Sequence, residues 1–288
     1  MDLHASGGKG GHPGVSIGSR NLPSWLGLAG VAARLVVHTP RPRNWMNPVG
    51  GPEVVGYTPG VTRPGVPPRG WFITIEGPEG AGKTTQVAAL SRYLADAGLD
   101  VHITREPGGT WLGERLRDVL LARTDSVAAT DPVTDALLFN AARRQLVTEV
   151  IRPALESGRT ILCARFADST LAYQGYGAGI ALELLRTLEH AATDGLEPDL
   201  TILLDLPVED GLARKAPSDL TRFEAEFDVA FHRRVRDGFL ALAAADPGRF
   251  AVVDASRPVD DVALAITAAV DRLVHSDEPN PAVVRTLG

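Results

Sequence analysis

Cysteine and long hydrophobic runs are scarce in this chain of 288 residues. Cys163 is the single cysteine, which excludes an internal disulfide and a cysteine zinc cluster and is typical of a reducing compartment. We therefore expect a cytoplasmic protein. No segment approaches about 18 uninterrupted apolar residues, so we predict neither a transmembrane helix nor a membrane partner.

Lysine is also scarce, and the overall charge is negative. Three of the 29 basic residues are lysines (Lys9, Lys83 and Lys215), and the net charge is -6. General nucleic-acid binders neutralise phosphates with excess positive charge, so that class is not expected. With 44% hydrophobic and 22% charged residues, most of the chain can form a buried core, which excludes a wholly disordered, collagen-like or coiled-coil protein.

The composition changes near residue 70. Residues 1–70 contain 14 glycines and 10 prolines, with seven basic residues against two acidic ones. Glycine and proline at this density interrupt regular structure, so we predict a disordered extension there and a flexible tail at 276–288. Residues 71–275 are patterned throughout and contain no internal repeat, which predicts a single domain.

Within that domain, short apolar runs alternate with helical patterns. The runs predict five buried strands, at residues 71–77, 100–104, 159–164, 199–206 and 249–255. Helical spacing predicts helices at 83–97, 111–122, 131–157, 222–245 and 258–274. Continuously apolar strands that alternate with helices form a parallel sheet covered on both faces. We therefore predict a three-layer α/β fold with a five-stranded parallel sheet.

A glycine-rich loop follows the first predicted strand. It reads Gly77-Pro78-Glu79-Gly80-Ala81-Gly82-Lys83-Thr84, which is G-x-x-x-x-G-K-T between a strand and a helix. The glycines let backbone amides close around phosphate oxygens at a helix N-terminus. Lys83 can reach the β- and γ-phosphates, and the Thr84 hydroxyl can bind Mg²⁺. The loop predicts a P-loop NTPase-type fold in which residues 77–85, including Thr85, bind ATP.

The loop alone does not name a reaction, because motors, GTPases and small-molecule kinases all use it. No guanine-reading N/T-K-x-D is present, and the chain is smaller than most motor ATPases. These features favour a small kinase. Asp205, at the end of the fourth predicted strand, is a candidate for the acid that accompanies many P-loops.

Five segments in fixed order then resemble one family. They are IEGPEGAGKTTQ (75–86), TREPGGT (104–110), LLFNAARRQL (137–146), ARFADSTLAYQG (164–175) and PDLTILLDL (198–206). Together they are similar to bacterial thymidylate kinases over most of 71–275. The resemblance implies a homodimer that uses Mg²⁺ and transfers the γ-phosphoryl group of ATP to dTMP, giving dTDP and ADP in dTTP biosynthesis.

The resemblance also implies roles for acceptor-site residues. Phe139 would stack on thymine and Arg143 would hydrogen-bond the base, although a core phenylalanine is an equally ordinary interpretation of Phe139. Glu79 would contact the 3′-hydroxyl, and Arg105 would bind the acceptor phosphate or form a structural ion pair. Pro107 would form a wall of the base pocket, and Ser169 and Thr170 would lie at the base edge. Tyr173 and Gln174 would lie beside the deoxyribose. There the Tyr173 ring would exclude a 2′-hydroxyl.

The catalytic cations implied by the resemblance are Lys83, Arg165 and Arg214. Arg165 would bridge the donor and acceptor phosphates, a role that suits a planar guanidinium. A mobile lid near 214–222 would bring Arg214, with Lys215 beside it, over the transferring group. Separately from the resemblance, we expect Thr84 to bind the metal directly and Glu224 to take part of its outer shell.

Two positions depart from the family pattern, since Ala164 and Thr221 stand where acids are usual. A lost carboxylate contact is worth roughly 1.5–3 kcal/mol, or about ten- to a few hundredfold in rate. We therefore expect a slower or retuned kinase rather than an inactive one. The alternatives are a kinase for another pyrimidine deoxynucleotide, such as dUMP, and a nucleotide-binding regulatory protein with weakened catalysis.

Overall fold

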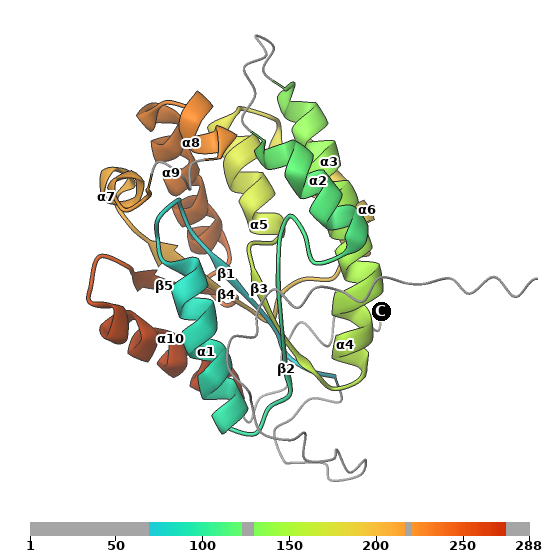
Figure 1. Cartoon of the computed structure of the whole chain (residues 1–288), viewed down its shortest axis with the longest axis vertical. Helices are drawn as coiled ribbons and strands as arrows, with labels where there is room; N and C mark the ends of the chain where they lie inside the picture. Colours follow the sequence, from blue (N-terminus) through green and yellow to red (C-terminus); the bar gives the residue numbers. More distant parts are fainter. Residues whose placement is uncertain (1–68, 123–129, 217–220, 275–288) are drawn as a thin grey trace, which may run out of the picture. The chain divides into compact units, whose positions relative to one another are not determined.

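The computed structural model describes residues 69–122, 130–216 and 221–274 (Figure 1). Five parallel strands form one sheet in the order β2-β3-β1-β4-β5. The strands are β1 (Phe72–Glu76), β2 (Val101–Arg105), β3 (Thr160–Ala164), β4 (Leu200–Asp205) and β5 (Phe250–Asp254). The predicted five-stranded parallel sheet is confirmed, and β1, which leads into the glycine-rich loop, lies at its centre.

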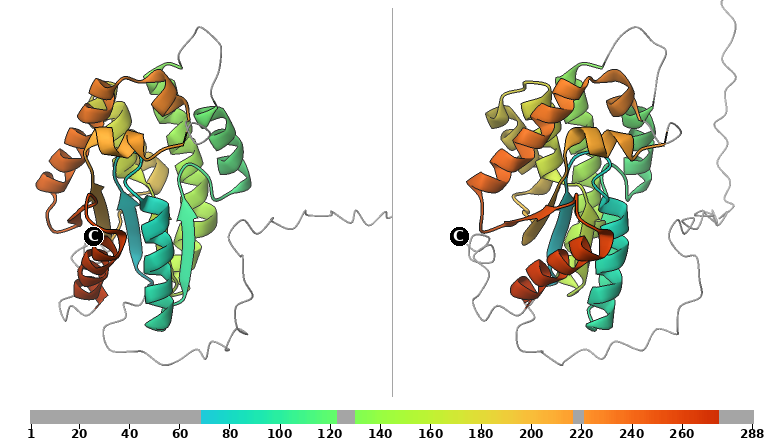
Figure 2. Two further views of the ribbon diagram at one scale, coloured as in Figure 1. Left: turned by 60° about the vertical axis from the view of Figure 1, so that its left-hand side comes forward. Right: turned by 90° about the vertical axis from the view of Figure 1, so that its left-hand side faces the viewer.

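Helices cover both faces of the sheet. On one face, α1 (Lys83–Asp96) and α10 (Val259–Val274) pack against Ile73 and Ile75 of β1 (Figure 2). On the other face, Phe72 packs in a cluster with Leu146 and Ile151. The remaining helical segments are α2 (Trp111–Leu121), α3 (Pro132–Leu146), α4 (Arg152–Glu156), α5 (Ala167–Thr170), α6 (Leu182–Thr193), α7 (Val208–Ala213), α8 (Arg222–Glu226) and α9 (Val229–Ala245), with wider π-helical turns at η1 (Val147–Ile151) and η2 (Leu171–Gly177).

Two of the predicted helices differ from the observed ones. The helix predicted at 131–157 is α3, η1 and α4 in succession, so the run is helical but contains a π-helical segment. The prediction of one helix at 222–245 is wrong, because α8 ends at Glu226 and α9 begins at Val229. Asp228 starts the second helix, since its carboxylate accepts a hydrogen bond from the Phe231 N–H at 2.7 Å.

The predictions for both ends of the chain lie largely outside the described residues. Residues 1–68 and 275–288 are among those that the structure does not describe, so the predicted extension and tail remain predictions. In the described part, no helix combines the length and apolar character that crossing a membrane requires.

Candidate active site

A cavity of about 540 Å³ lies where β1, β2 and β3 end. In parallel α/β sheets this carboxyl edge is where ligands bind. The cavity brings together most of the residues singled out from the sequence: Glu79, Gly80, Ala81, Gly82, Lys83, Thr84, Thr85, Arg105, Pro107, Phe139, Arg165, Ser169, Thr170, Tyr173, Gln174, Arg214 and Lys215. Gly77, Pro78 and Arg143 are not among the lining residues, and the Glu224 side chain lies outside the description.

The glycine-rich loop folds tightly between β1 and α1. Gly80 has a φ of +71°, and a Cβ there would lie 2.0 Å from the Gly211 carbonyl oxygen, so no larger residue fits. The Lys83 ammonium turns back onto its own loop and donates to the carbonyl oxygens of Gly77 at 2.9 Å and Pro78 at 2.7 Å. Burial and the nearby Arg165 lower the pKa of Lys83 to about 7. Negative phosphate oxygens in the loop would favour its charged form.

Glu79 is the centre of a charged network at the cavity wall. Its Oε1 accepts hydrogen bonds from the Arg165 guanidinium at 2.6 Å and from the Tyr173 hydroxyl at 2.9 Å. Its Oε2 lies 3.4 Å from the Lys215 ammonium. Burial would raise the pKa of Glu79, but Arg165, Lys83 and Lys215 outweigh it and hold the pKa well below its usual range. Glu79 is therefore ionised and joins three segments distant in sequence.

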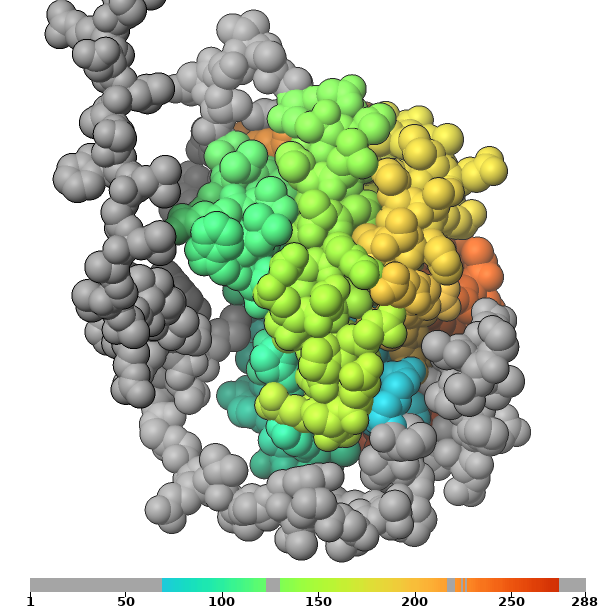
Figure 3. All heavy atoms as spheres, turned by 90° about the vertical axis from the view of Figure 1, so that its right-hand side faces the viewer, coloured from blue at the N-terminus to red at the C-terminus, as the bar shows by residue number. Residues whose placement is uncertain are grey.

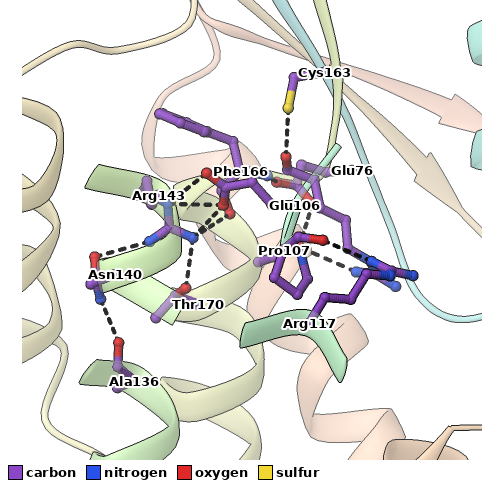
Figure 4. A network of polar contacts seen from close by, with 12 residues as sticks. Glu76, Glu106, Pro107, Arg117, Ala136, Asn140, Arg143, Cys163, Phe166 and Thr170 are labelled. Carbon is purple, nitrogen blue, oxygen red and sulfur yellow. Dashed lines mark hydrogen bonds and ion pairs between the residues drawn. The ribbon is translucent and has the colours of Figure 1, made fainter. Parts of the chain in front are cut away.

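Arg143 does not line the cavity but contacts residues that do, among them Glu106 and Thr170 (Figure 4). It is 1% exposed, and its guanidinium donates to the Glu106 carboxylate at distances down to 2.7 Å. Further bonds run to Asn140 at 3.0 Å and to the Thr170 hydroxyl at 2.9 Å. Burial raises the pKa of Glu106 while Arg143 opposes that shift. Because Glu106 and Thr170 line the cavity, Arg143 shapes it through these partners, and its direct contact with a base remains a prediction.

Two further arginines lie on the side of the cavity formed after β2. Arg105 donates to Glu114 of α2 at 3.0 Å and also lines the cavity, so both sequence interpretations of Arg105 remain open. Arg117 donates to the Pro107 carbonyl at 2.9 Å, and burial and the charge of Arg105 lower its pKa. Sequence reasoning missed Arg117, because one arginine on an amphipathic helix is usually a solvated side chain. An anionic group beside Arg105 and Arg117 would be stabilised.

Aromatic side chains form another part of the cavity lining. Phe139, from α3, lines it and lies 6.2 Å from the Phe223 ring, measured between ring centroids. Phe223 also packs edge-on against Tyr173 at 5.7 Å. Phe223 directly follows the predicted lid at 214–222, and sequence reasoning gave it no role in the cavity. The ring separation leaves no room for a base between Phe139 and Phe223, so a stacked base would use the other face of Phe139.

The predicted lid at 214–222 is only partly described, because residues 217–220 lie outside the described ranges. Arg214 donates to the Ala255 carbonyl at 3.4 Å and lines the cavity. Arg222 is buried, and its guanidinium donates hydrogen bonds to the Leu120 carbonyl and to the Asp135 carboxylate, both at 2.6 Å. Arg222 therefore anchors α8 to α2 and α3 and is not available to a phosphate.

The side chains available to a metal are few. Thr84 is exposed at the start of α1 and lines the cavity. Asp205, the candidate acid that ends β4, forms a bidentate ion pair with Arg236 at 2.7 and 2.9 Å. Among the described residues no group of three or more His, Cys, Asp or Glu could hold a metal ion. Thr84 therefore offers a hydroxyl oxygen at the cavity, which is the kind of ligand that a hard cation takes.

Known proteins resemble the region that contains this cavity. A family model described as thymidylate kinase matches residues 75–266. The thymidylate kinase of Deinococcus radiodurans is 53% identical over 193 residues, which cover 67% of this chain and 92% of the relative. The thymidylate kinase of Thermomicrobium roseum is also 53% identical, over 201 residues that cover 69% of this chain and 93% of the relative. A crystal structure of thymidylate kinase from Ehrlichia chaffeensis matches with a TM-score of 0.56 at 34% identity, covering 70% of this chain and 99% of its own.

Proposed function

The chain belongs to the thymidylate kinase family, and we propose that its cavity binds ATP and dTMP together and transfers the γ-phosphoryl group to dTMP. The observation that carries this proposal is the continuity of the cavity. A phosphate-binding loop, a cluster of arginines and an aromatic wall all line the same space of about 540 Å³. Two nucleotides can therefore meet with their phosphates between Lys83 and Arg105.

Transfer depends on positioning and on neutralising charge, and cationic side chains of this chain supply both. Lys83 leaves its carbonyl partners to hold the β- and γ-phosphates. Arg165 lies between the loop and Tyr173, bonded to Gly77 at 3.3 Å and to Tyr173 at 3.2 Å, which suits a bridge between donor and acceptor phosphates. Arg105 and Arg117 would hold the acceptor phosphate. The dTMP phosphate oxygen then attacks the γ-phosphorus directly, and ADP leaves.

Mg²⁺ is the proposed cofactor. When bound with ATP, it would supply positive charge that stabilises the charge developing during transfer. Thr84 is the described residue that would hold it, through a hydroxyl exposed at the loop. Its sequence-predicted companion Glu224 remains a prediction.

The acceptor half favours a pyrimidine deoxynucleotide. Phe139 offers a ring for stacking, and the hydroxyls of Ser169 and Thr170 lie at the cavity surface. The Tyr173 hydroxyl and the Glu79 carboxylate are 2.9 Å apart, so a sugar beside them meets an acceptor for its 3′-hydroxyl and a ring that would exclude a 2′-hydroxyl.

A coupled assay of ADP release tests the proposal. We expect turnover with ATP, Mg²⁺ and dTMP to exceed that with dUMP, dCMP, dGMP and UMP. Lys83→Ala should abolish it, whereas Arg92→Ala, which removes an exposed positive charge from the same helix, should not. Equal turnover in Lys83→Ala and wild type would contradict the proposal. Preference for another acceptor would change the substrate and leave the chemistry in place.

We also propose that the chain forms a homodimer through the face made by α2, α3 and α6 (Figure 3). Large apolar side chains are exposed on these helices: Trp111 at 76%, Val119 at 65%, Val133 at 38%, Leu137 at 50% and Leu184 at 43%. Exposed apolar patches of this kind are typical of association surfaces. A cytoplasmic location, suggested by the single cysteine, also remains a proposal.

Light scattering during size-exclusion chromatography tests the dimer. Leu137→Glu places a charge within the face, and we expect it to convert dimers to monomers. Leu264→Glu is the matched control, since Leu264 is 68% exposed but lies on α10. A wild-type monomer, or dissociation by the control alone, would refute this interface.

A further inference from the structure

Glu76 is a buried acid beside the site that does not line the cavity. It ends the central strand β1 and is 0% exposed. One carboxylate oxygen accepts a hydrogen bond from the Phe166 N–H, and the other accepts one from the Ser169 hydroxyl, both at 2.6 Å. Phe166 and Ser169 follow the neighbouring strand β3, so Glu76 joins the end of β1 to the turn and the short helix α5 that come after β3 (Figure 4).

That turn holds Arg165 in an unusual backbone conformation. Arg165 has a φ of +67°, in the left-handed region that residues with a side chain rarely adopt. Such a conformation persists when the surrounding bonds impose it. The Arg165 N–H donates to the Ile75 carbonyl at 3.0 Å, and the Cys163 thiol donates to the Arg165 carbonyl at 3.0 Å. Glu76 holds the next N–H along the chain, so it completes the constraint.

Glu76 reaches the Arg165 side chain as well. The Ser169 hydroxyl that donates to Glu76 accepts a hydrogen bond from the Arg165 guanidinium at 3.2 Å. The same carboxylate thus acts on the backbone of Arg165 through Phe166 and on its side chain through Ser169. We infer that Glu76 is a positioning residue that holds the Arg165 guanidinium between the donor and acceptor phosphates. This inference rests on the phosphoryl transfer proposed above.

A matched control lies at the opposite end of β1. Asp199 is also buried, and its carboxylate accepts a hydrogen bond from the Phe72 N–H at 2.7 Å and from Arg69 at 2.6 Å. Like Glu76 it links a strand end to a neighbouring segment, but neither Phe72 nor Arg69 lines the cavity. A carboxylate that serves only the fold should behave as Asp199 does.

Stability and activity should respond in opposite directions to loss of the Glu76 charge. Burial, reinforced by repulsion from Asp168, raises the pKa of Glu76 to about 7, against the opposing effects of Arg165 and the two hydrogen bonds. Above that pH the buried carboxylate is ionised, and this lowers the free energy of unfolding. Glutamine has nearly the same shape and no charge, but its amide nitrogen cannot accept the Ser169 hydrogen. We expect the Glu76→Gln protein to fold normally, with the Arg165 guanidinium held less firmly in its position.

The experiment compares Glu76→Gln with Asp199→Asn at pH 8. For Glu76→Gln we expect an unchanged or higher Tm, a kcat about 10- to 100-fold lower, and KM values for ATP and dTMP within about twofold of wild type. For Asp199→Asn we expect a lower Tm and an unchanged kcat. In a double-mutant cycle, Glu76→Gln should add little to the loss caused by Arg165→Lys, because both changes remove one function.

Three results would overturn the inference: a Glu76→Gln protein that unfolds at pH 8, a kcat equal to wild type, or losses in kcat that add fully with those of Arg165→Lys. Failure of the proposed function is seen separately, as a wild-type protein that does not phosphorylate any nucleoside monophosphate.

Discussion

The ion pair between Arg143 and Glu106 gives a prediction about stability that can be worked out from the structure. The side chains are 1% and 4% exposed, and the shortest distance between them is 2.7 Å. Arg143→Met would leave the Glu106 carboxylate buried without its positive partner. Breaking a buried pair in this way costs about 3–5 kcal/mol. For a domain of roughly 200 residues, that lowers Tm by about 6–20 °C.

The deficit should also depend on pH. Burial already raises the pKa of Glu106, and Arg143 is the group that opposes the shift, so its removal raises the pKa further. A raised folded-state pKa contributes stability below the unfolded-state value of 4.5, and this contribution is lost as pH rises through the folded-state value. Arg143→Met should therefore be further below wild type in stability at pH 8 than at pH 5.5.

Urea unfolding at both pH values measures the effect. Arg144→Met is the control, because its neighbouring guanidinium pairs with Asp194 at the surface, 46% exposed, and should leave the midpoint almost unchanged. Adding Glu106→Gln to Arg143→Met should recover much of the loss at pH 8, since no buried charge remains. A deficit below about 1 kcal/mol, or one that is equal at both pH values, would refute the reasoning.

Three further changes have defined outcomes. Tyr173→Phe removes the hydroxyl that bonds Glu79 and Arg165, and should lower kcat/KM for dTMP about tenfold in steady-state assays while Tm changes little. Thr84→Ala should raise the Mg²⁺ concentration needed for half-maximal rate in a magnesium titration, and an unchanged titration would exclude Thr84 as a ligand. Phe223→Ala removes a ring that is 6% exposed and should cost about 3–5 kcal/mol in urea unfolding, so a loss under about 1 kcal/mol would show that the ring is dispensable.

Most strands were predicted well because they are short apolar runs bounded by polar or glycine residues, although β2 also contains His102 and Thr104. The segment after β3 was not assigned any structure from the sequence, although Ala167–Gly177 is helical throughout. Glycine disfavours helices, and Gly175 and Gly177 lie in this one. Tertiary packing explains them: a Cβ at Gly177 would lie 2.7 Å from Phe231, and one at Gly175 would lie 2.5 Å from Leu182. Phe231 is distant in sequence, and Leu182 comes after the end of η2. Local helix propensity therefore could not reveal this helix.

The site divides in the same way between local and long-range information. The phosphate loop is contiguous, and its residues could be identified from spacing alone. The pairing of Arg143 with Glu106 spans 37 residues, and the bond from Arg165 to Glu79 spans 86. No local pattern specifies such contacts. Sequence reasoning therefore named Arg143 and Arg165 but could not predict that the second lines the cavity and the first does not.

The charges of the cavity bear on Ala164 and Thr221, where the resemblance leads us to expect acids. Both of these residues line the cavity, and among the described lining residues two are acidic, Glu79 and Glu106. The basic lining residues are Lys83, Arg105, Arg117, Arg165, Arg214 and Lys215. A cavity with this excess of positive charge attracts phosphates before any metal binds. A carboxylate near the metal would strengthen the binding of Mg²⁺, but it would also repel the phosphates of the bound nucleotide. We therefore expect the absence of acids at these two positions to weaken metal binding more than substrate binding, so the proposed transfer remains feasible.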